Sequence, residues 1–427
     1  MAISNASRRV VVTGTGAVSA IGHSVADLWS AMKQGRSGVA PIERFFQNDP
    51  HFLTPEQIPN FELGIMIAAQ VKGFEHRARL RHFKRDKIIL FADRYSLFAA
   101  AAADEGLKQS GLELPIRAPQ RGACIIGSAE AGITNLEIAY RHIFELKQAS
   151  SHPLTLVRFI GSSAAAHLGI EFGIKGPVFG ICSACASGAH AISMGRDLIR
   201  SGLVDVAVVG GSEAPHTYGT MQIWEATKLL SPDGIFPFAR KRNGTVLAEG
   251  AGVLVLESIE HAAARGAKVL AELCGVGATL DGADMVHTGP DGAAEAMRRA
   301  LDDAQLAPGD IGYVSAHGMG TVEADRNETA AIKSAFGAHA RTLAASATKS
   351  MYGNPLGASG AIGAITCIKA MEEGWMPPTL GLDEPDPECD LDYVANVGRA
   401  KKLTYTMANA FALTGLNVSL VFGPPPA

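Results

Sequence analysis

Short apolar segments alternate with longer helical patterns along this chain of 427 residues. The apolar segments cover residues 8–13, 122–127, 205–210, 252–257, 312–316 and 418–422, and the helical patterns include residues 25–33, 184–201, 293–304 and 361–373. Strands with this spacing, each followed by a helix, are typical of layered α/β proteins. The alternation therefore predicts an α/β fold.

Two of the expected helices open with similar runs of small residues. Residues 184–189 read ACASGA and residues 357–361 read GASGA, and each helix then reaches a glycine, Gly202 or Gly374. Small residues at a helix start allow two backbones to approach closely, as expected where two helices meet in a crowded core. An echo of this length fits a duplicated fold, but it also fits a chance similarity.

Composition excludes several classes of protein. Only 19% of the residues are charged and 47% are hydrophobic, which indicates a large buried interior or a subunit interface. A net charge of -4 argues against a nucleic-acid binder, and no apolar run reaches the ~18 residues that span a bilayer. The start of the chain shows no signal-peptide pattern, and six cysteines fit reduced thiols. We expect a cytoplasmic protein without a membrane span or a nucleic-acid partner.

Cys185 is the strongest candidate for a chemical role. It follows an extended segment and lies in the first turn of an expected helix, where unpaired N–H groups and the helix dipole favour a thiolate. These would lower the pKa of the thiol to roughly 7 or below and make it a nucleophile. A buried structural cysteine and a redox or zinc pair with Cys182 are the alternatives. Because no second Cys pair or nearby His completes a site, we expect no metal.

His317 and Lys349 are further candidates, because each follows an expected strand. A glycine-bracketed loop could present the His317 ring to a cavity, although a core histidine is the alternative. A lone Lys349 would be costly in a buried position unless Asp325 or Glu328 pairs with it. Those two acids stand at helical spacing, and otherwise they would be solvated charges on a helix.

Two other motifs are weaker. Gly14 and Gly16 open like a dinucleotide fingerprint, but Ser19 occupies the third glycine position, so we expect a tight turn after the first strand. A second motif, the basic run, contains only one acid, Asp86, and could be a solvated helix face or a docking site for an acidic partner. The basic run consists of Arg77, Arg79, Arg81, Lys84, Arg85 and Lys87.

Taken together, these segments resemble the β-ketoacyl-acyl-carrier-protein synthases of the elongating (type I/II) kind, within the thiolase superfamily. The resemblance covers nearly the whole chain and rests on RRVVVTG at 8–14, SACASG at 183–188, NGTVLAEGAG at 243–252, HG at 317–318, TKSM at 348–351 and residues 409–417. It implies a duplicated five-layer α-β-α-β-α sandwich. The halves would be residues 1–258, with the nucleophile, and residues 259–427, with the rest of the site. It also implies a homodimer, or a heterodimer with a ketosynthase homologue.

The resemblance further implies a mechanism. Cys185 would accept an acyl group from the phosphopantetheine arm of an acyl carrier protein, with the backbone N–H groups of Cys185 and Leu413 as the oxyanion hole. A malonyl-type extender would lose carbon dioxide, helped by a hydrogen bond from His317, and its enolate would attack the acyl thioester. Lys349, paired with Glu328, would set the charge balance of the site. The carrier's phosphopantetheine would be the only cofactor, and the basic run would dock the carrier.

One departure from the family pattern concerns proton transfer. Asn354 stands where elongating synthases carry a second His. Its amide can donate a hydrogen bond to an enolate oxygen but cannot shuttle a proton. Cys-His-Asn is nevertheless the set that initiating synthases and plant-type condensing enzymes use, so condensation stays chemically feasible.

Other departures lie where substrate would bind. The family's His-Gly-Thr-x-Thr loop keeps the hydroxyl of Thr321 but has Met319 in place of the first Thr. Its gating Gly-Phe-Gly-Gly segment becomes Ala412, Leu413, Thr414 and Gly415, followed by Leu416, which should stiffen the gate. We expect the substrate and its pantetheine arm to contact Met319, Thr321, Ala412 and Thr414.

These departures predict an atypical acyl chain and a specialised pathway, such as polyketide or secondary lipid synthesis, rather than housekeeping fatty-acid elongation. Two alternatives stay open. Cys185 could pass its acyl group to another acceptor without decarboxylation, or the chain could be a non-catalytic subunit of a ketosynthase heterodimer. The presence of both Cys185 and His317 argues against the second alternative.

Overall fold

Ten strands form one hydrogen-bonded ladder in the computed structural model, which describes residues 8–43, 62–282, 284 and 287–426. Five strands belong to the first part of the chain: β1 (Val10–Ser19), β4 (Gly122–Gly127), β5 (Val178–Ile181), β6 (Val206–Glu213) and β7 (Gly250–Ser258). The other five are β8 (Ala271–Leu280), β9 (Ile311–Ser315), β10 (Ala344–Ser346), β13 (Tyr405–Phe411) and β14 (Leu416–Gly423). Their order is β10-β9-β13-β14-β8-β1-β7-β6-β4-β5.

The strand order repeats itself on the two sides of the central pair, β1 and β8. Outward from the centre, β1, β7, β6, β4 and β5 correspond to β8, β14, β13, β9 and β10. On each side the first two pairings are antiparallel and the next two are parallel. The echo in the sequence therefore reflects a duplicated fold, whereas the boundary between residues 258 and 259 stays a prediction.

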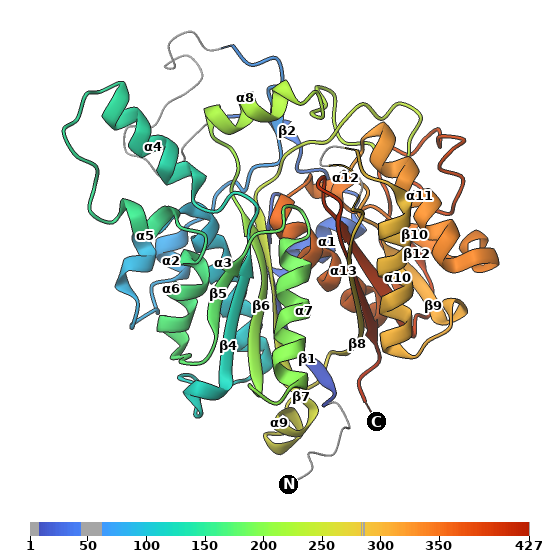
Figure 1. The fold of residues 1–427 in the computed structure, drawn as a ribbon, viewed down its shortest axis with the longest axis horizontal. Helices are drawn as coiled ribbons and strands as arrows, with labels where there is room; N and C mark the ends of the chain where they lie inside the picture. Colours follow the sequence, from blue (N-terminus) through green and yellow to red (C-terminus); the bar gives the residue numbers. More distant parts are fainter. Residues whose placement is uncertain (1–7, 44–61, 283, 285–286, 427) are drawn as a thin grey trace.

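Helices form three layers around the two groups of strands (Figure 1). On one outer side, α3 (Arg94–Ser110) and α6 (Ser163–Phe172) cover the first group; on the other, α10 (Pro290–Ala304) covers the second group, with α11 (Val322–Phe336) packed on it. Between the groups lie α7 (Ser187–Arg200) and α13 (Ser359–Glu373), which contact each other and strands of both halves. This arrangement confirms the five-layer α-β-α-β-α sandwich.

The remaining elements connect these layers. They are the helices α1 (Val25–Lys33), α2 (His76–Arg79), α4 (Ile133–Phe144), α5 (Thr155–Phe159), α8 (Tyr218–Ala226), α9 (Ile259–Ala264) and α12 (Lys349–Tyr352), and two small sheets, β2 (Ala40–Pro41) with β3 (Ile67–Ala68) and β11 (Trp375–Met376) with β12 (Arg399–Ala400). Local sequence sets several helix ends. Ser24 caps α1 by accepting a hydrogen bond from the Asp27 backbone N–H, and Gly111 ends α3 in a left-handed conformation with φ of 64°.

The turn that we expected at Gly14 and Gly16 is wrong, because β1 continues through both residues. They face α3 instead. A Cβ added at Gly14 would lie 1.9 Å from the Gly106 carbonyl oxygen, and one at Gly16 would lie 1.9 Å from that of Ala102. These glycines thus let the alanine-rich helix pack directly on the strand.

Glycines also bring the starts of α7 and α13 together at the centre of the molecule. A Cβ at Gly188 would lie 2.7 Å from the Gly357 carbonyl oxygen, and one at Gly360 would lie 2.7 Å from Cβ of Ala189. On the adjoining strand β6, a Cβ at Gly211 would lie only 2.2 Å from the same Gly357 oxygen. The small residues of the sequence echo are therefore required for this contact.

We predict that Gly211→Ala lowers the free energy of unfolding by about 1–3 kcal/mol, because the added methyl group must displace a packed backbone carbonyl. Urea unfolding measures the change. Gly309→Ala is the matched control, since a Cβ at Gly309 would meet no atom within 4 Å. Equal unfolding midpoints for the two variants would contradict this view of the helix contact.

Candidate active site

Cys185 lies in a tight turn between β5 and α7. Because α7 begins at Ser187, the sulfur precedes the helix rather than lying in its first turn. Ala184, just before the cysteine, has φ of 48°, which is uncommon for a residue with a side chain. The hydroxyl of Ser187 fixes the turn, accepting from the Ser183 backbone N–H at 2.9 Å and donating to the Ala184 carbonyl oxygen at 2.6 Å.

The thiol of Cys185 is buried, and only 2% of the residue is exposed. Burial raises its pKa to about 11; the Lys349 ammonium opposes this rise, and the buried carboxyl groups of Glu213 and Glu130 add to it. The pKa near 7 that we expected from the sequence is therefore wrong for this conformation, because desolvation of the thiolate outweighs the favourable helix start. Cys185 and Cys182 are both free cysteines.

His317 follows β9, and its buried ring lies beside Lys349. The Lys349 ammonium donates to the His317 carbonyl oxygen at 2.6 Å, and its Nζ lies 3.4 Å from Nδ1 of the ring. Burial, and after it the charge of Lys349, lower the pKa of His317 well below its usual range, so the ring is neutral. An ammonium facing Nδ1 favours the tautomer that carries its proton on Nε2. Among the described residues, Nε2 has no hydrogen-bond partner.

Glu328, on α11, holds the His317 loop. Its two carboxylate oxygens accept from the backbone N–H groups of His317 and Gly318, both at 2.7 Å. Asp325 lies one turn earlier and accepts from the Gly320 N–H at 3.0 Å. Within the described part of the chain, neither acid forms an ion pair with Lys349, so the expected pairing is wrong. Burial lowers the pKa of Lys349 to about 8, although the charges of Cys185 and both acids act in the opposite direction.

Asn354 is fully buried just beyond α12, the short helix that begins at Lys349. Its backbone is fixed, since its N–H donates to the Val246 carbonyl oxygen at 2.8 Å and its own carbonyl oxygen accepts from the Ala248 N–H at 3.0 Å. The side-chain oxygen accepts from the Ser359 hydroxyl at 3.1 Å. The amide nitrogen Nδ2 finds no partner among the described residues. A buried donor left unpaired costs about 1–3 kcal/mol, which a ligand could recover.

Two backbone donors expected to form an oxyanion hole are also unpaired. Neither the Cys185 N–H nor the Leu413 N–H donates to an acceptor within the described residues. Leu413 lies in the turn between β13 and β14, which is closed by hydrogen bonds from the Ala412 N–H to the Leu416 oxygen at 2.8 Å and from the Gly415 N–H to the Ala412 oxygen at 2.9 Å. Both N–H groups are therefore available to a ligand.

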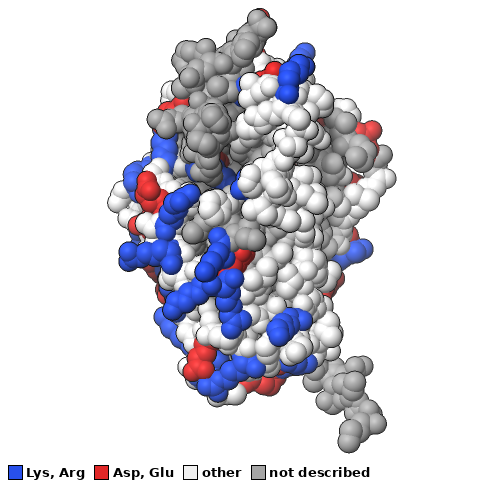
Figure 2. Space-filling model, turned by 90° about the vertical axis from the view of Figure 1, so that its left-hand side faces the viewer, with Lys and Arg blue, Asp and Glu red and all other residues white. Residues whose placement is uncertain are grey.

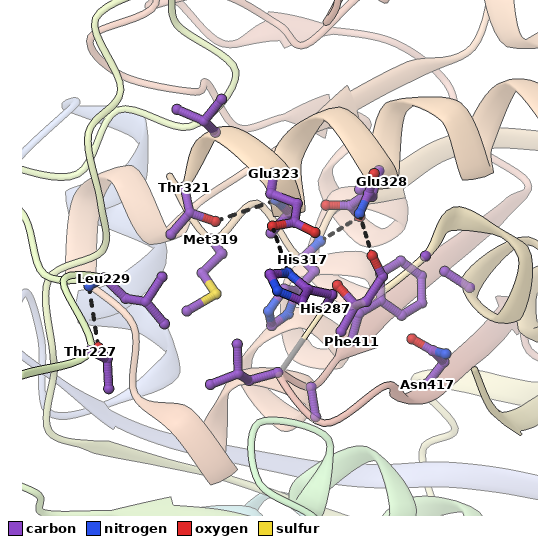
Figure 3. Close-up of a pocket in the computed structure, with 18 of the residues that line it drawn as sticks. Thr227, Leu229, His287, His317, Met319, Thr321, Glu323, Glu328, Phe411 and Asn417 are labelled. Carbon is purple, nitrogen blue, oxygen red and sulfur yellow. Dashed lines mark hydrogen bonds and ion pairs between the residues drawn. The ribbon is translucent and has the colours of Figure 1, made fainter. Parts of the chain in front are cut away.

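A cavity of about 650 Å³ opens beside His317, and Figure 3 shows Met319 and Phe411 among the side chains around it. Three of the residues expected to contact substrate line it, namely Met319, Thr321 and Ala412, and so does Leu413, which was expected in the oxyanion hole. The Thr321 hydroxyl also caps α11 by accepting from the Ala324 N–H at 3.4 Å. Cys185, Asn354 and Thr414 are not among the lining residues. The buried thiol therefore does not open onto the cavity in this conformation.

The basic run lies in α2 and the segment after it. All of its members are exposed except Arg79, which is half-buried and donates to the His23 carbonyl oxygen at 2.9 Å. The Arg77 guanidinium lies over the Phe91 ring, 5.6 Å from its centroid. Figure 2, which views the molecule from this side, shows Lys and Arg side chains gathered on part of the face with few acids among them. The surface is therefore suited to an acidic partner.

The sequence interpretation missed Glu213 and Glu130, two carboxyl groups whose charges act on Cys185. Glu213, at the end of β6, accepts from the Ser128 hydroxyl at 2.8 Å and from the backbone N–H groups of Ala129 and Gly357 at 2.7 Å and 2.9 Å. Glu130 accepts from the Trp224 indole N–H at 2.8 Å. The sequence did offer one signal for Glu130. In GSAEAG at 127–132, an acid stands among small residues directly after a buried strand.

The described residues lack two further features. None of their helices is long and apolar enough to span a membrane. No group of three or more His, Cys, Asp or Glu side chains among them is arranged to hold a metal ion.

Family models and curated relatives match this chain over most of its length. Residues 7–262 match the family model of the β-ketoacyl synthase N-terminal domain, and residues 270–383 match that of the C-terminal domain. Nodulation protein E of Rhizobium leguminosarum bv. trifolii is 42% identical over 415 residues, which are 97% of this chain and 99% of the relative. The 3-oxoacyl-[acyl-carrier-protein] synthase 2 of Staphylococcus aureus is 34% identical over 422 residues, covering 97% of this chain and 98% of the relative.

Solved structures give the same assignment. The ishigamide ketosynthase/chain length factor superimposes with a TM-score of 0.89 at 32% identity, covering 99% of this chain and 100% of that chain. A type II PKS ketosynthase in complex with its acyl-carrier protein and bound to the hexaketide, AntDE:AntF, gives a TM-score of 0.86 at 30% identity, with coverage of 98% and 100%. Together with the family matches, these similarities show that the chain belongs to the β-ketoacyl synthase family.

Proposed function

We propose that this protein is a ketosynthase, which condenses a malonyl-type carrier-protein thioester with an acyl group held on Cys185 and releases carbon dioxide. The observation that carries the proposal is a pair of buried donors without partners, Nε2 of His317 and Nδ2 of Asn354. Decarboxylation places negative charge on a thioester oxygen. Fixed N–H donors in a site shielded from water stabilise such a charge strongly.

Loading is the first step. The sulfur of Cys185 attacks the carbonyl carbon of the acyl thioester, and the bond to the pantetheine sulfur breaks. The unpaired N–H groups of Cys185 and Leu413 would hold the oxyanion that forms on the way. The proton of the Cys185 thiol leaves with the departing pantetheine thiol, so the exchange is balanced. Because the sulfur does not open onto the cavity, a segment must move for this step, and we expect it to be the turn at residues 412–415, from which Ala412 and Leu413 line the cavity.

Condensation follows once the extender replaces the first carrier. The bond between the extender's carboxylate and its α-carbon breaks, and the electron pair forms an enolate whose oxygen accepts from His317 and Asn354. The α-carbon then attacks the acyl carbonyl, and Cys185 leaves as a thiolate near the Lys349 ammonium. Neither His317 nor Asn354 has to give up a proton, which suits a ring kept neutral by burial and an amide that does not titrate.

The acyl groups would arrive on the phosphopantetheine of an acyl carrier protein, with no other cofactor. The cavity beside His317 and the nearby Met319 and Thr321 supports entry of the arm on that side. The relatives support a specialised pathway, since they include a nodulation protein and ketosynthases of polyketide systems.

The open edge of the ten-stranded sheet supports a homodimer or a heterodimer with a homologue. β5 is the last strand in the order, so one of its edges has no neighbour within the described chain. Large apolar side chains are exposed on nearby connecting helices, including Tyr140 and Phe144 on α4 and Leu156 on α5. The structural neighbour named as a ketosynthase/chain length factor is itself a pairing of two such chains.

We predict that Asn354→Leu lowers the release of labelled carbon dioxide from malonyl-carrier protein about 100-fold or more, because one stabilising donor is lost. Loading of Cys185, followed by intact mass spectrometry, should not change. Asn354→Asp is the matched variant, since it keeps the shape and a carboxyl protonated by burial can still donate, so it should lose less of this release than Asn354→Leu. Cys185→Ala should abolish loading. A wild-type protein that loads an acyl group but releases no carbon dioxide would favour acyl transfer without decarboxylation.

The pKa values predict the pH dependence of thiol alkylation. Because the pKa of Cys185 is raised to about 11, its thiolate fraction is small at neutral pH, and the rate of alkylation by iodoacetamide should still be rising above pH 9. Lys349→Met removes a charge that favours the thiolate, so alkylation should be slower below about pH 8, where Lys349 is charged, and should approach the wild-type rate above it. Lys33→Met, at an exposed ion pair with Glu373, is the control and should match the wild type. A rate that levels off near pH 7 would contradict the prediction.

The basic run predicts that charge reversal on this surface weakens the use of carrier-linked substrates but not of substrates on free pantetheine. Arg81→Glu combined with Lys84→Glu should raise KM for a carrier-linked acyl group about tenfold, and added salt should shrink the difference. KM for an acyl group on free pantetheine should not change. Lys268→Glu combined with Lys402→Glu, at exposed positions in the second half of the chain, is the matched control. If both double variants bind the carrier equally well, the basic run is a solvated surface.

A further inference from the structure

Glu130 stands in a loop that packs directly on the nucleophile's turn. The loop follows β4, whose last residue, Gly127, is so close to the turn that an added Cβ would lie 2.3 Å from the carbonyl carbon of Ser187. The Cys182 sulfur lies 3.5 Å from the Ala129 carbonyl oxygen, which also belongs to this loop. The charge of the Glu130 carboxyl group acts on the acyl-carrying sulfur, and the mechanism above leaves this group unused.

One oxygen of this carboxyl group has no partner. Oε1 accepts from the Trp224 indole N–H at 2.8 Å, but Oε2 is buried and makes no hydrogen bond to any described residue. The next residue, Ala131, has φ of 51°, a conformation that costs energy in a residue with a side chain. Such strain is found chiefly where the fold holds a functional group in place.

Glu213 makes a useful contrast, because its charge also acts on the nucleophile but both of its oxygens are hydrogen-bonded. Its oxygens accept from four donors, which include the backbone N–H of Glu130 at 3.2 Å. Glu213 thus holds the loop in position. The free oxygen of Glu130 has no such structural task.

The protonated form of Glu130 is a hydrogen-bond donor. Burial, and after it the charge of Glu213, raise the pKa of Glu130, which favours this form. Because the Trp224 N–H occupies Oε1, the acid proton belongs on Oε2. The result is an unpaired O–H group.

Trp224, whose indole N–H binds this carboxyl group, packs like Ile138 against the hydrophobic cluster that contains Cys185 and Met221. An alkyl chain placed among these side chains would leave the O–H without a partner, whereas a chain with an oxygen at the right position would accept its hydrogen bond.

We propose that Glu130 recognises an oxygen atom on the acyl chain carried by Cys185, so that the protein selects chains with a keto or hydroxyl group over plain alkyl chains of equal length. This inference rests on the proposed function and names its substrate class. Glu130 acts as a specificity residue and takes no part in the bond changes.

The experiment is a loading competition. Octanoyl-carrier protein competes with carriers bearing 3-, 5- or 7-oxooctanoyl groups or the matching hydroxy acids, and intact mass spectrometry reads which chain reaches Cys185. We expect the wild type to prefer at least one oxygenated chain about 10- to 100-fold, the ratio typical of one buried hydrogen bond. Glu130→Leu should remove or reverse the preference, whereas Glu130→Gln should retain most of it, because an amide N–H can also donate.

Glu145→Leu is the matched control, since Glu145 is an exposed acid at the end of α4. If Glu130→Leu does not fold, Glu130→Met takes its place. The proposal is overturned if the wild type prefers no oxygenated chain, if the preference survives the apolar substitution, or if that substitution alters only the pH profile of Cys185 alkylation. A wild type that loads no chain at all, octanoyl included, counts instead against the proposed function.

Discussion

Close contact between the starts of α7 and α13 is the constraint on which the rest of the structure depends. Gly188, Gly211 and Gly357 leave no room for a Cβ at this point, so the two repeats meet there through their backbones. The contact sets the nucleophile of the first half against the Lys349 ammonium of the second, close enough for each charge to act on the other. A duplicated fold thus builds one site from two halves, and neither half carries all of its groups.

Burial then decides the protonation of that site. The same loss of solvation raises the pKa of Cys185 and Glu130 and lowers the pKa of His317 and Lys349. At neutral pH the resting site therefore combines a neutral Cys185 thiol and a neutral His317 ring with the Lys349 ammonium, and its unpaired N–H donors are held by the backbone and by buried side chains. Such a site can stabilise a transient oxyanion or enolate without reorganising, since its donors are already desolvated and aimed.

The sequence predicted those elements that show a clear apolar run or a helical pattern of their own. The bounds of β4 and α1 agree with the expected ranges, and the expected α7 differs only at its ends. β8 and β13 were missed, since they alternate apolar and small polar residues that become strand only by pairing with β14. The pKa of Cys185 was wrong because a helix-end argument cannot see burial by distant segments. Glu130 was missed because its partner, Trp224, is 94 residues away.

A single turnover of isolated acyl-protein shows whether Cys185 carries the group that is extended. Protein acylated on Cys185, freed from the donor carrier, is mixed with malonyl-carrier protein and followed by mass spectrometry. We expect the acyl mass to leave the protein and to reappear on the carrier as a β-keto chain two carbons longer. Acyl groups that stay on Cys185, or that leave without extension, would contradict this expectation.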